Sequence, residues 1–175
     1  MNDAKFIAPT AEEYGKFYET YVAQFQPTDF LTAFQGQIDE LNDLLGNLPP
    51  AEETRYHEPY TWNLKQLMGH LIDCERIFST RLLRIAVGDT TPIPGMEHQQ
   101  YVDNLDYESV DMVELLAEFG HLRKSNVLLA SRLSRTELIR MGTASGLPVS
   151  ANANLFIMGG HVAYHLNIIR MRLNR

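Results

Sequence analysis

Apolar residues recur at helical spacing in four long stretches of this sequence, and convincing strand alternation is absent between them. The stretches are about residues 29–45, 63–87, 109–133 and 150–173. A helix with one apolar face must bury that face, and helices of this length bury it well against one another. The pattern therefore predicts an all-α protein built as a four-helix bundle.

Capping and breaking residues mark the ends of these helices. Thr28 can cap the first helix, and the segment Gly46–Pro50 ends it. Asn63 and Gln66 have the spacing of a capping box at the start of the second helix. Ser150 is a good N-cap for the last helix.

The linkers differ in length, and this difference predicts the order of the helices. Residues 88–108 form a linker of about 20 residues, whereas antiparallel neighbours in a bundle are usually joined by about 2–8. Such a linker can return along the bundle, which gives an up-down-down-up order with the last helix antiparallel to the second. Residues 134–149 are expected to form a second linker, with Gly142, Gly146 and Pro148.

The N-terminal segment 11–26 is expected to be an additional short helix that precedes the bundle. It carries an aromatic stripe at helical spacing, formed by Tyr14, Phe17, Tyr18, Tyr21 and Phe25. A stripe of this kind is typical of a packing surface. It can cover a second copy of the chain in a homodimer or pack on its own bundle.

Composition and charge narrow the class of protein. Residues 1–175 fit a single globular domain, with 45% hydrophobic and 21% charged residues. The formal charge of −7 argues against a nucleic-acid partner. Arg76, Arg81 and Arg84 are predicted to form a solvated helix face with local ion pairs.

Three further features favour a cytoplasmic protein. Cys74 is a single cysteine and cannot form an internal disulfide. The N-terminus lacks the basic and apolar regions of a secretory signal. No uninterrupted apolar run approaches 18 residues, so no membrane span is expected.

Three histidines lie on two of the predicted helices: His70 in WNLKQLMGHLIDCER, and His161 and His165 in MGGHVAYHLNIIRMR. At i, i+4 the later two lie about 40° apart around a helix and about 6 Å apart along it. In the predicted order, His70 lies at their level on an antiparallel helix. Three neutral imidazoles can hold a divalent metal and leave a coordination position open. The competing interpretation is hydrogen-bonded core histidines.

Neighbouring residues have two interpretations each. Cys74, four residues after His70, can form a His–Cys chelate or serve as a small buried hydrophobe. Asp73 can orient the His70 imidazole or form an ion pair with Arg76. Tyr164 can donate a proton near a substrate or pack between helices.

Further polar candidates lie away from these helical positions. Glu97 and His98, in the long linker, can act in a lid, as a fourth metal ligand, or remain solvated. His57 and His121 have no neighbours that indicate chemistry. Gly159 and Gly160, directly before His161, predict a close helix approach at that point.

Several motifs together resemble a known family. They are Trp62–Arg76, Pro92–Gly95 with Tyr101 and Val102, Leu122–Arg123, and Gly160–Asn167. Over about residues 13–172 the sequence resembles the DinB-like (DinB/YfiT-like) family of metal-binding four-helix-bundle proteins. The resemblance implies an up-down-down-up bundle and a divalent metal held by His70, His161 and His165.

The resemblance also suggests a range of functions. Relatives include thiol S-transferases that use bacillithiol or mycothiol, mycothiol-dependent maleylpyruvate isomerases, and the N-terminal part of ergothioneine-synthesis enzymes. It implies a metal-dependent enzyme that activates a low-molecular-weight thiol or water for transfer to a small electrophilic substrate. The metal could be zinc, nickel, iron or manganese. The alternative is a non-catalytic, dimeric metal-binding or stress-related protein whose metal is structural. The family pattern supplies no carboxylate as general base.

Overall fold

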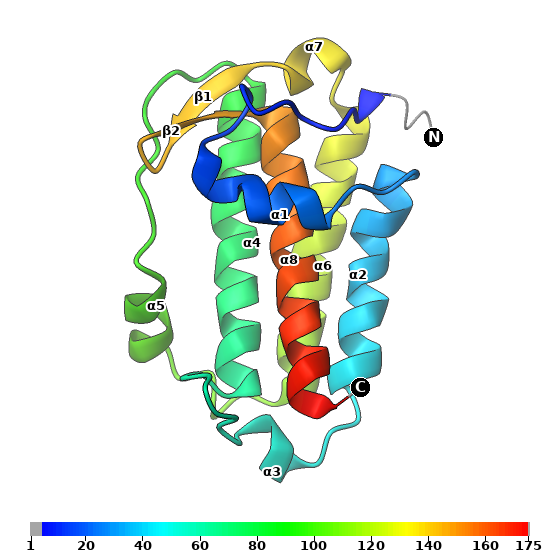
Figure 1. The fold of residues 1–175 in the computed structure, drawn as a ribbon, viewed down its shortest axis with the longest axis vertical. Coiled ribbons are helices and arrows are strands. Elements are labelled where there is room, and N and C mark those ends of the chain that lie inside the picture. The colour runs from blue at the N-terminus through cyan, green and yellow to red at the C-terminus, as the bar shows by residue number, and fades with distance from the viewer. Residues whose placement is uncertain (1–4, 175) are drawn as a thin grey trace.

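The computed structural model describes residues 5–174 and contains the predicted bundle (Figure 1). Its long helices are α2 (Phe30–Leu45), α4 (Leu64–Ala86), α6 (Met112–Arg132) and α8 (Ala151–Leu173). Each begins and ends within three residues of its predicted stretch. The all-α bundle is therefore confirmed.

The helices follow the predicted up-down-down-up order (Figure 1). Helices α2 and α8 run in one direction, and α4 and α6 run in the other. Helix α4 contacts α6 and α8, and α2 contacts the same two helices. The connection from α4 to α6 returns along the outside of the bundle and contains the short helix α5 (His98–Asn104). Helices α4 and α8 are thus antiparallel neighbours.

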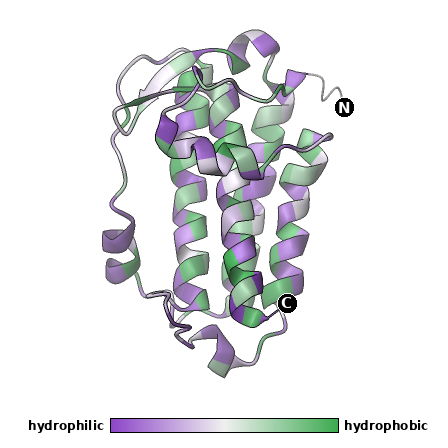
Figure 2. Ribbon diagram, in the orientation of Figure 1, coloured by the Kyte–Doolittle hydropathy of each residue, from purple (hydrophilic) through white to green (hydrophobic). Residues whose placement is uncertain are grey.

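Helices α2 and α4 alternate between apolar and hydrophilic residues, whereas the first half of α8 is buried on all sides, and α5 and the short helix α3 (Pro50–Glu53) are mostly hydrophilic (Figure 2). Alternation of this kind is typical of helices that bury one face and expose the other. Within residues 5–174, no helix combines the length and apolarity needed to cross a lipid bilayer.

The helix ends largely follow the expected capping chemistry. The Asn63 side chain accepts a hydrogen bond from the Gln66 amide at 2.9 Å, and the Gln66 side chain accepts one from the Asn63 amide at 3.0 Å. The Ser150 side chain caps α8. The prediction for Thr28 is wrong, because Asp29 caps α2 instead. Its carboxylate accepts a backbone hydrogen bond where the helix dipole favours negative charge.

The N-terminal segment is less helical than predicted. Within residues 11–26, only the 3-10 turn η2 (Lys16–Tyr18) and the helix α1 (Glu19–Gln24) are helical. Tyr14 instead forms an isolated β-bridge with Val149. A backbone pairing with a distant segment replaces the first turn of the expected helix.

The aromatic stripe of this segment packs on its own bundle. Helix α1 lies across α8, and Tyr18 and Phe25 are buried there (Figure 1). Phe17 remains 69% exposed. A second copy of the chain is not needed to cover the stripe, and the homodimer stays a prediction.

The segment 134–149 is not a simple linker. It contains the helix α7 (Arg135–Leu138) and an antiparallel hairpin of β1 (Met141–Ala144) and β2 (Leu147–Ser150). Strands of four residues are too short to show a clear alternation. Ser145 and Gly146 form the turn with φ of 54° and 74°, as in a two-residue hairpin whose turn matches the strand twist.

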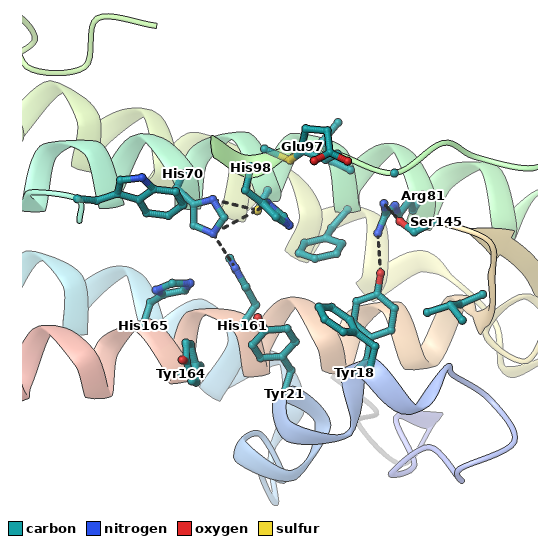
Figure 3. Close-up of a pocket in the computed structure, with 18 residues that line it drawn as sticks. Tyr18, Tyr21, His70, Arg81, Glu97, His98, Ser145, His161, Tyr164 and His165 are labelled. Carbon is teal, nitrogen blue, oxygen red and sulfur yellow. Dashed lines mark hydrogen bonds between the residues drawn. The ribbon is translucent and has the colours of Figure 1, made fainter. Parts of the chain in front are cut away.

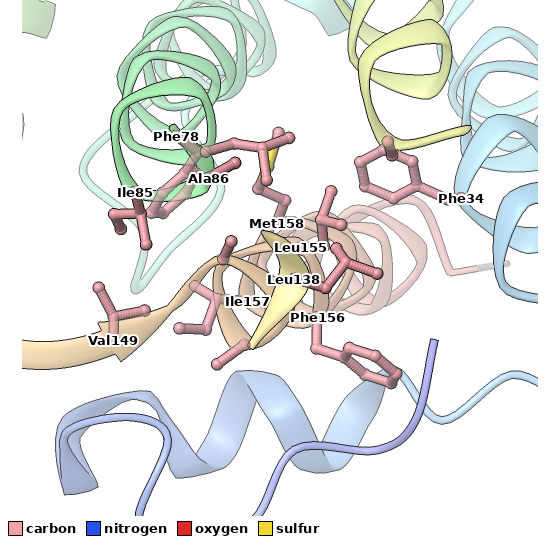
Figure 4. Packing of buried hydrophobic residues seen from close by; sticks show 14 of the residues in the cluster. Phe34, Phe78, Ile85, Ala86, Leu138, Val149, Leu155, Phe156, Ile157 and Met158 are labelled. Atoms are coloured by element: carbon pink, nitrogen blue, oxygen red, sulfur yellow. The ribbon is translucent and has the colours of Figure 1, made fainter. Parts of the chain in front are cut away.

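The apolar core has two parts, one toward each end of the bundle. One part contains Phe34, Leu82 and Phe156 and includes the packing in Figure 4. The other contains Leu41 and Phe119. A layer of buried polar side chains separates them, formed by Gln37, His70, Glu75, Arg123, Asn126 and His161. His70 and His161 belong to this layer, and His165 lies next to it.

Candidate metal centre

Helices α4 and α8 bring His70, His161 and His165 together (Figure 3). We call these residues the histidine triad. The Nε2 atoms of His70 and His161 are 3.1 Å apart, and the ring centroids of His161 and His165 are 4.6 Å apart. One ring nitrogen from each histidine lies within 4.8 Å of the others, and all three side chains are buried. The side chains meet as their spacing predicts, and metal binding itself stays a prediction.

The donor atoms of the triad suit a metal ion. Two nitrogens that bind one tetrahedral ion at roughly 2.0–2.1 Å lie about 3.3 Å apart. The separation between His70 and His161 is close to this value. Nδ1 of His165 is buried and has no hydrogen-bond partner among residues 5–174, which is costly for a polar atom unless a ligand satisfies it. Within residues 5–174, none of the three rings hydrogen-bonds to a backbone carbonyl.

Burial keeps the triad in the form that binds metals. Burial, with a smaller contribution from nearby histidines, lowers the pKa of His70 to about 2 and that of His165 to about 4. Burial also holds the pKa of His161 well below its ordinary value. The imidazoles are therefore neutral at physiological pH and offer lone pairs rather than positive charge.

Cys74 and His98 lie beside the triad and form a second potential group of ligands with His70. The Cys74 sulfur is 3.7 Å from His70 Nδ1 and 3.9 Å from His98 Nδ1. Burial raises the pKa of the Cys74 thiol, so a neutral thiol is favoured in the absence of metal. His98 is exposed at the edge of the cavity, and Glu97 lines the same cavity.

Asp73 does not orient the His70 ring. Its carboxylate accepts a hydrogen bond from the Tyr107 hydroxyl and lies 3.7 Å from the Arg76 guanidinium. Of the two interpretations, the ion pair with Arg76 is the one observed, although Asp73 is buried rather than on the surface. Tyr164 lines the cavity and packs edge-on against His165 at 5.2 Å.

Two other histidines lie apart from the triad. His57 lies 3.3 Å from Arg172 and 3.6 Å from Glu52, and it lines a second, smaller pocket with them. His121 is exposed on α6. Neither contributes to the candidate centre.

The glycine pair on α8 allows α1 to cross directly over the triad. A Cβ atom added at Gly160 would collide with the Tyr21 carbonyl, and one added at Gly159 would collide with the Phe25 ring. The close approach predicted for these glycines is confirmed. It places the Tyr21 ring edge-on against His161, with centroids 5.3 Å apart.

A cavity of about 710 Å³ opens from the triad (Figure 3). Sequence reasoning missed several of its lining residues, including Tyr18, Tyr21, Trp62 and Ser145. Most of these lie outside the long helices, so no helical spacing relates them to the histidines.

The predicted solvated arginine face is wrong for one of its three members. Arg76 and Arg84 keep partly exposed side chains and form ion pairs. Arg81 is only 4% exposed and lines the cavity. The signal for this was available, because position 81 lies 11 residues after His70 and 11 residues return a helix to the same face.

Comparisons with known proteins agree with this architecture. The model of the DinB superfamily matches residues 33–169. YfiT from Bacillus subtilis, described as a probable metal-dependent hydrolase with an unusual four-helix bundle topology, superposes with a TM-score of 0.74. It is 14% identical, and the match covers 83% of this chain and 86% of YfiT. No curated protein matches the sequence.

A mycothiol-dependent maleylpyruvate isomerase also shares the fold, with a TM-score of 0.67 and 16% identity. The match covers 85% of this chain and 62% of the isomerase, so the chain spans less than two thirds of that protein. At these identities the two likenesses concern the fold.

Proposed function

The chain belongs to the DinB superfamily, and from this membership and the geometry of the triad we propose that it is a metal-dependent enzyme. The histidine triad would hold one divalent ion of zinc, nickel, iron or manganese. Such an ion acts as a Lewis acid that lowers the pKa of a bound thiol or water molecule. The proposed reaction transfers this nucleophile to a small electrophilic substrate, as in a thiol S-transferase or a hydrolase.

One observation carries the proposal: three buried, neutral imidazoles converge at one side of a cavity of about 710 Å³. Three protein ligands with open space beside them are typical of a catalytic metal site, whereas structural zinc sites are closed by four. The space fits a small molecule, and cavities of this size are common for such ligands. The net charge of −7 does not favour nucleic acid as the substrate.

The surrounding residues have defined roles in this proposal. Trp62 lies 4.9 Å from the His70 ring, and Phe78 lies 5.8 Å from the His161 ring. These aromatic side chains would keep bulk water from the nucleophile. The His98 ring is only partly covered, and this partial burial lowers its pKa, so the imidazole is neutral at the cavity edge and would accept the proton that the nucleophile releases.

The related structures support both branches of the proposal. YfiT is described as a probable metal-dependent hydrolase, and the isomerase depends on mycothiol, a thiol. A hydrolase would activate water, and a thiol transferase would activate a sulfur nucleophile. The same open coordination position beside the triad would bind either nucleophile.

A second candidate is a non-catalytic, dimeric metal-binding or stress-related protein in which the metal only joins α4 to α8. The position of Cys74 and His98 beside His70 favours it, since a fourth ligand from this pair would close the site. The two candidates differ in the number of protein ligands.

The proposal is tested by metal analysis of the untagged, full-length protein. We expect one equivalent of divalent metal after loading, and at least a hundredfold weaker binding in His70→Asn, His161→Asn and His165→Asn. His121→Asn is the matched control, since this histidine is exposed on α6. The loaded protein is then assayed with low-molecular-weight thiols, or water alone, against electrophiles.

Two results would overturn the proposal. One is a wild-type protein that binds no metal above the level of the triple variant His70→Asn, His161→Asn, His165→Asn. The other is consumption of electrophile at equal rates by the loaded wild type and that triple variant.

A further inference from the structure

Arg81 shares the cavity with the histidine triad but has a different environment. It lies on α4, 11 residues after His70, which is about 20° around the helix and roughly 16 Å along it. Both residues therefore face the cavity from the same side of α4 (Figure 3). Arg81 is 4% exposed, so its guanidinium has lost most of its hydration.

The partners of Arg81 are all neutral. Nη2 donates to Ser145 Oγ at 2.8 Å and to the Pro94 carbonyl at 3.5 Å, and Nη1 lies 3.4 Å from the Tyr18 hydroxyl. Nε is buried and has no hydrogen-bond partner in the part of the chain that the structure describes. A guanidinium has five N–H donors, so at least two of them are left without an acceptor.

A second buried arginine, Arg123, has the counterion that Arg81 lacks among the described residues. Arg123 is fully buried and forms a bidentate ion pair with Glu75 at 2.8 Å. Among residues 5–174, no acidic side chain lies within 4.0 Å of the Arg81 guanidinium, and Glu97, which lines the same cavity, is exposed. A buried charge without a counterion is costly, so an unpaired guanidinium in a cavity points to an anionic ligand.

The hairpin holds Ser145 in place for this contact. Ser145 has a left-handed φ of 54°, which is uncommon for a residue other than glycine, asparagine or aspartate. Backbone hydrogen bonds tie the hairpin to the loop after α4: Ile93 donates to Thr143 at 2.9 Å, and Ser145 donates to Ile93 at 3.0 Å. The hydroxyl next to Arg81 is thus fixed before any ligand arrives.

We propose that Arg81, with the hydroxyls of Ser145 and Tyr18, binds an oxyanion group of the substrate or thiol cofactor. The ligand class is an extended small molecule with a carboxylate or phosphate at one end. The guanidinium suits both, since its planar donors match either group. That the other end of the ligand reacts at the histidine triad rests on the proposed function. The anion site itself does not need the metal.

The test uses the metal-free, full-length protein, because carboxylates and phosphate also bind metals directly. Succinate and inorganic phosphate are titrated separately, at constant ionic strength set with sodium chloride. Binding is followed through the backbone amide resonances of positions 145 and 146 in the ¹⁵N NMR spectrum, which the variants at Arg81, Arg84 and Ser145 all retain. We expect a saturable shift with at least one anion, and the preferred anion identifies a carboxylic acid or a phosphate ester.

Variants of two arginines on α4 distinguish anion binding at this site from nonspecific electrostatic attraction of anions to the protein. Arg81→Gln should weaken binding of the preferred anion at least tenfold. Arg84→Gln should bind as the wild type does, because Arg84 forms its ion pair with Asp89 away from the cavity. If Arg81→Gln does not give a wild-type circular dichroism spectrum, Ser145→Ala replaces it, with an expected loss of at least threefold.

The outcomes distinguish the anion site from the metal site. Full metal binding in Arg81→Gln together with lost anion binding supports the proposal. The proposal is overturned if neither anion gives a saturable shift, or if the folded variant at Arg81 or Ser145 binds as tightly as the wild type. Failure of the metal analysis would leave these titrations unaffected, since they are performed without metal.

Discussion

Glu75 on α4 accepts two hydrogen bonds of 2.8 Å from Arg123 on α6, and neither side chain reaches solvent. Asn126 donates a third to the same carboxylate at 2.8 Å. Gln37 on α2 accepts from Arg123 at 2.6 Å and donates to the Gly159 carbonyl on α8 at 2.7 Å. One polar network therefore joins the four bundle helices, and it meets α8 two residues before His161.

Removing one partner of the buried Glu75–Arg123 ion pair should strongly destabilise the fold. Arg123→Met leaves the Glu75 carboxylate without its counterion, and loss of one partner of a buried pair typically lowers the free energy of unfolding by about 3–5 kcal/mol. Urea denaturation of the metal-free protein measures this change. The double variant Glu75→Met, Arg123→Met should recover most of the loss, because it removes both charges. A loss below about 1 kcal/mol in Arg123→Met would contradict this account.

Gly160 should not tolerate a side chain. Gly160→Ala would push a Cβ atom into the Tyr21 carbonyl, and a backbone atom cannot turn away as a flexible side chain does. Overpacking of this kind typically costs about 1–3 kcal/mol, so α1 should be displaced and cut faster by protease. Gly36→Ala on α2 is the control. A Cβ there meets nothing within 4 Å, and the gain in helix propensity should stabilise by up to about 1 kcal/mol. Equal effects of the two variants would contradict the prediction.

The bundle was predictable because its helices are long and their apolar residues keep one period. The return of the chain between α4 and α6 followed from linker length alone. The triad was predictable for a related reason: His161 and His165 share a helix face, and the antiparallel order brings His70 to their level. Each of these inferences uses geometry within a helix or between whole helices.

The rest of the site depends on contacts between distant segments, which the helical spacing of residues does not predict. Tyr21 reaches His161 because α1 crosses the glycine pair, and Ser145 reaches Arg81 through a four-residue hairpin. Apolar periodicity also overlooks polar residues that are buried. Arg81 and Arg123 are both buried. Position 81 shares a helix face with His70, but the sequence does not show which side chains surround either guanidinium.

Cys74 and His98 distinguish an open metal site from a closed one. For the proposed enzyme, Cys74→Ala, His98→Asn and Glu97→Gln should each change the affinity for divalent metal by less than about threefold, because the triad supplies the protein ligands. In the structural alternative, one of these variants should weaken binding by about 10–100-fold or more. Competition with a chromogenic chelator gives the affinities. A large loss at any of the three positions would favour the closed site.

The metal-free protein should lose stability as the pH falls below about 6.5. Burial depresses the pKa of each triad histidine, to about 4 for His165 and about 2 for His70, whereas the unfolded chain titrates near 6.5. Between these values the unfolded state binds more protons, so the free energy of unfolding decreases with decreasing pH, at a slope of up to one proton per histidine. Urea denaturation at pH 7.5, 6.5 and 5.5 measures the slope. Replacing the three histidines with glutamine should remove most of it, and an unchanged slope in that variant would assign the titration to other groups.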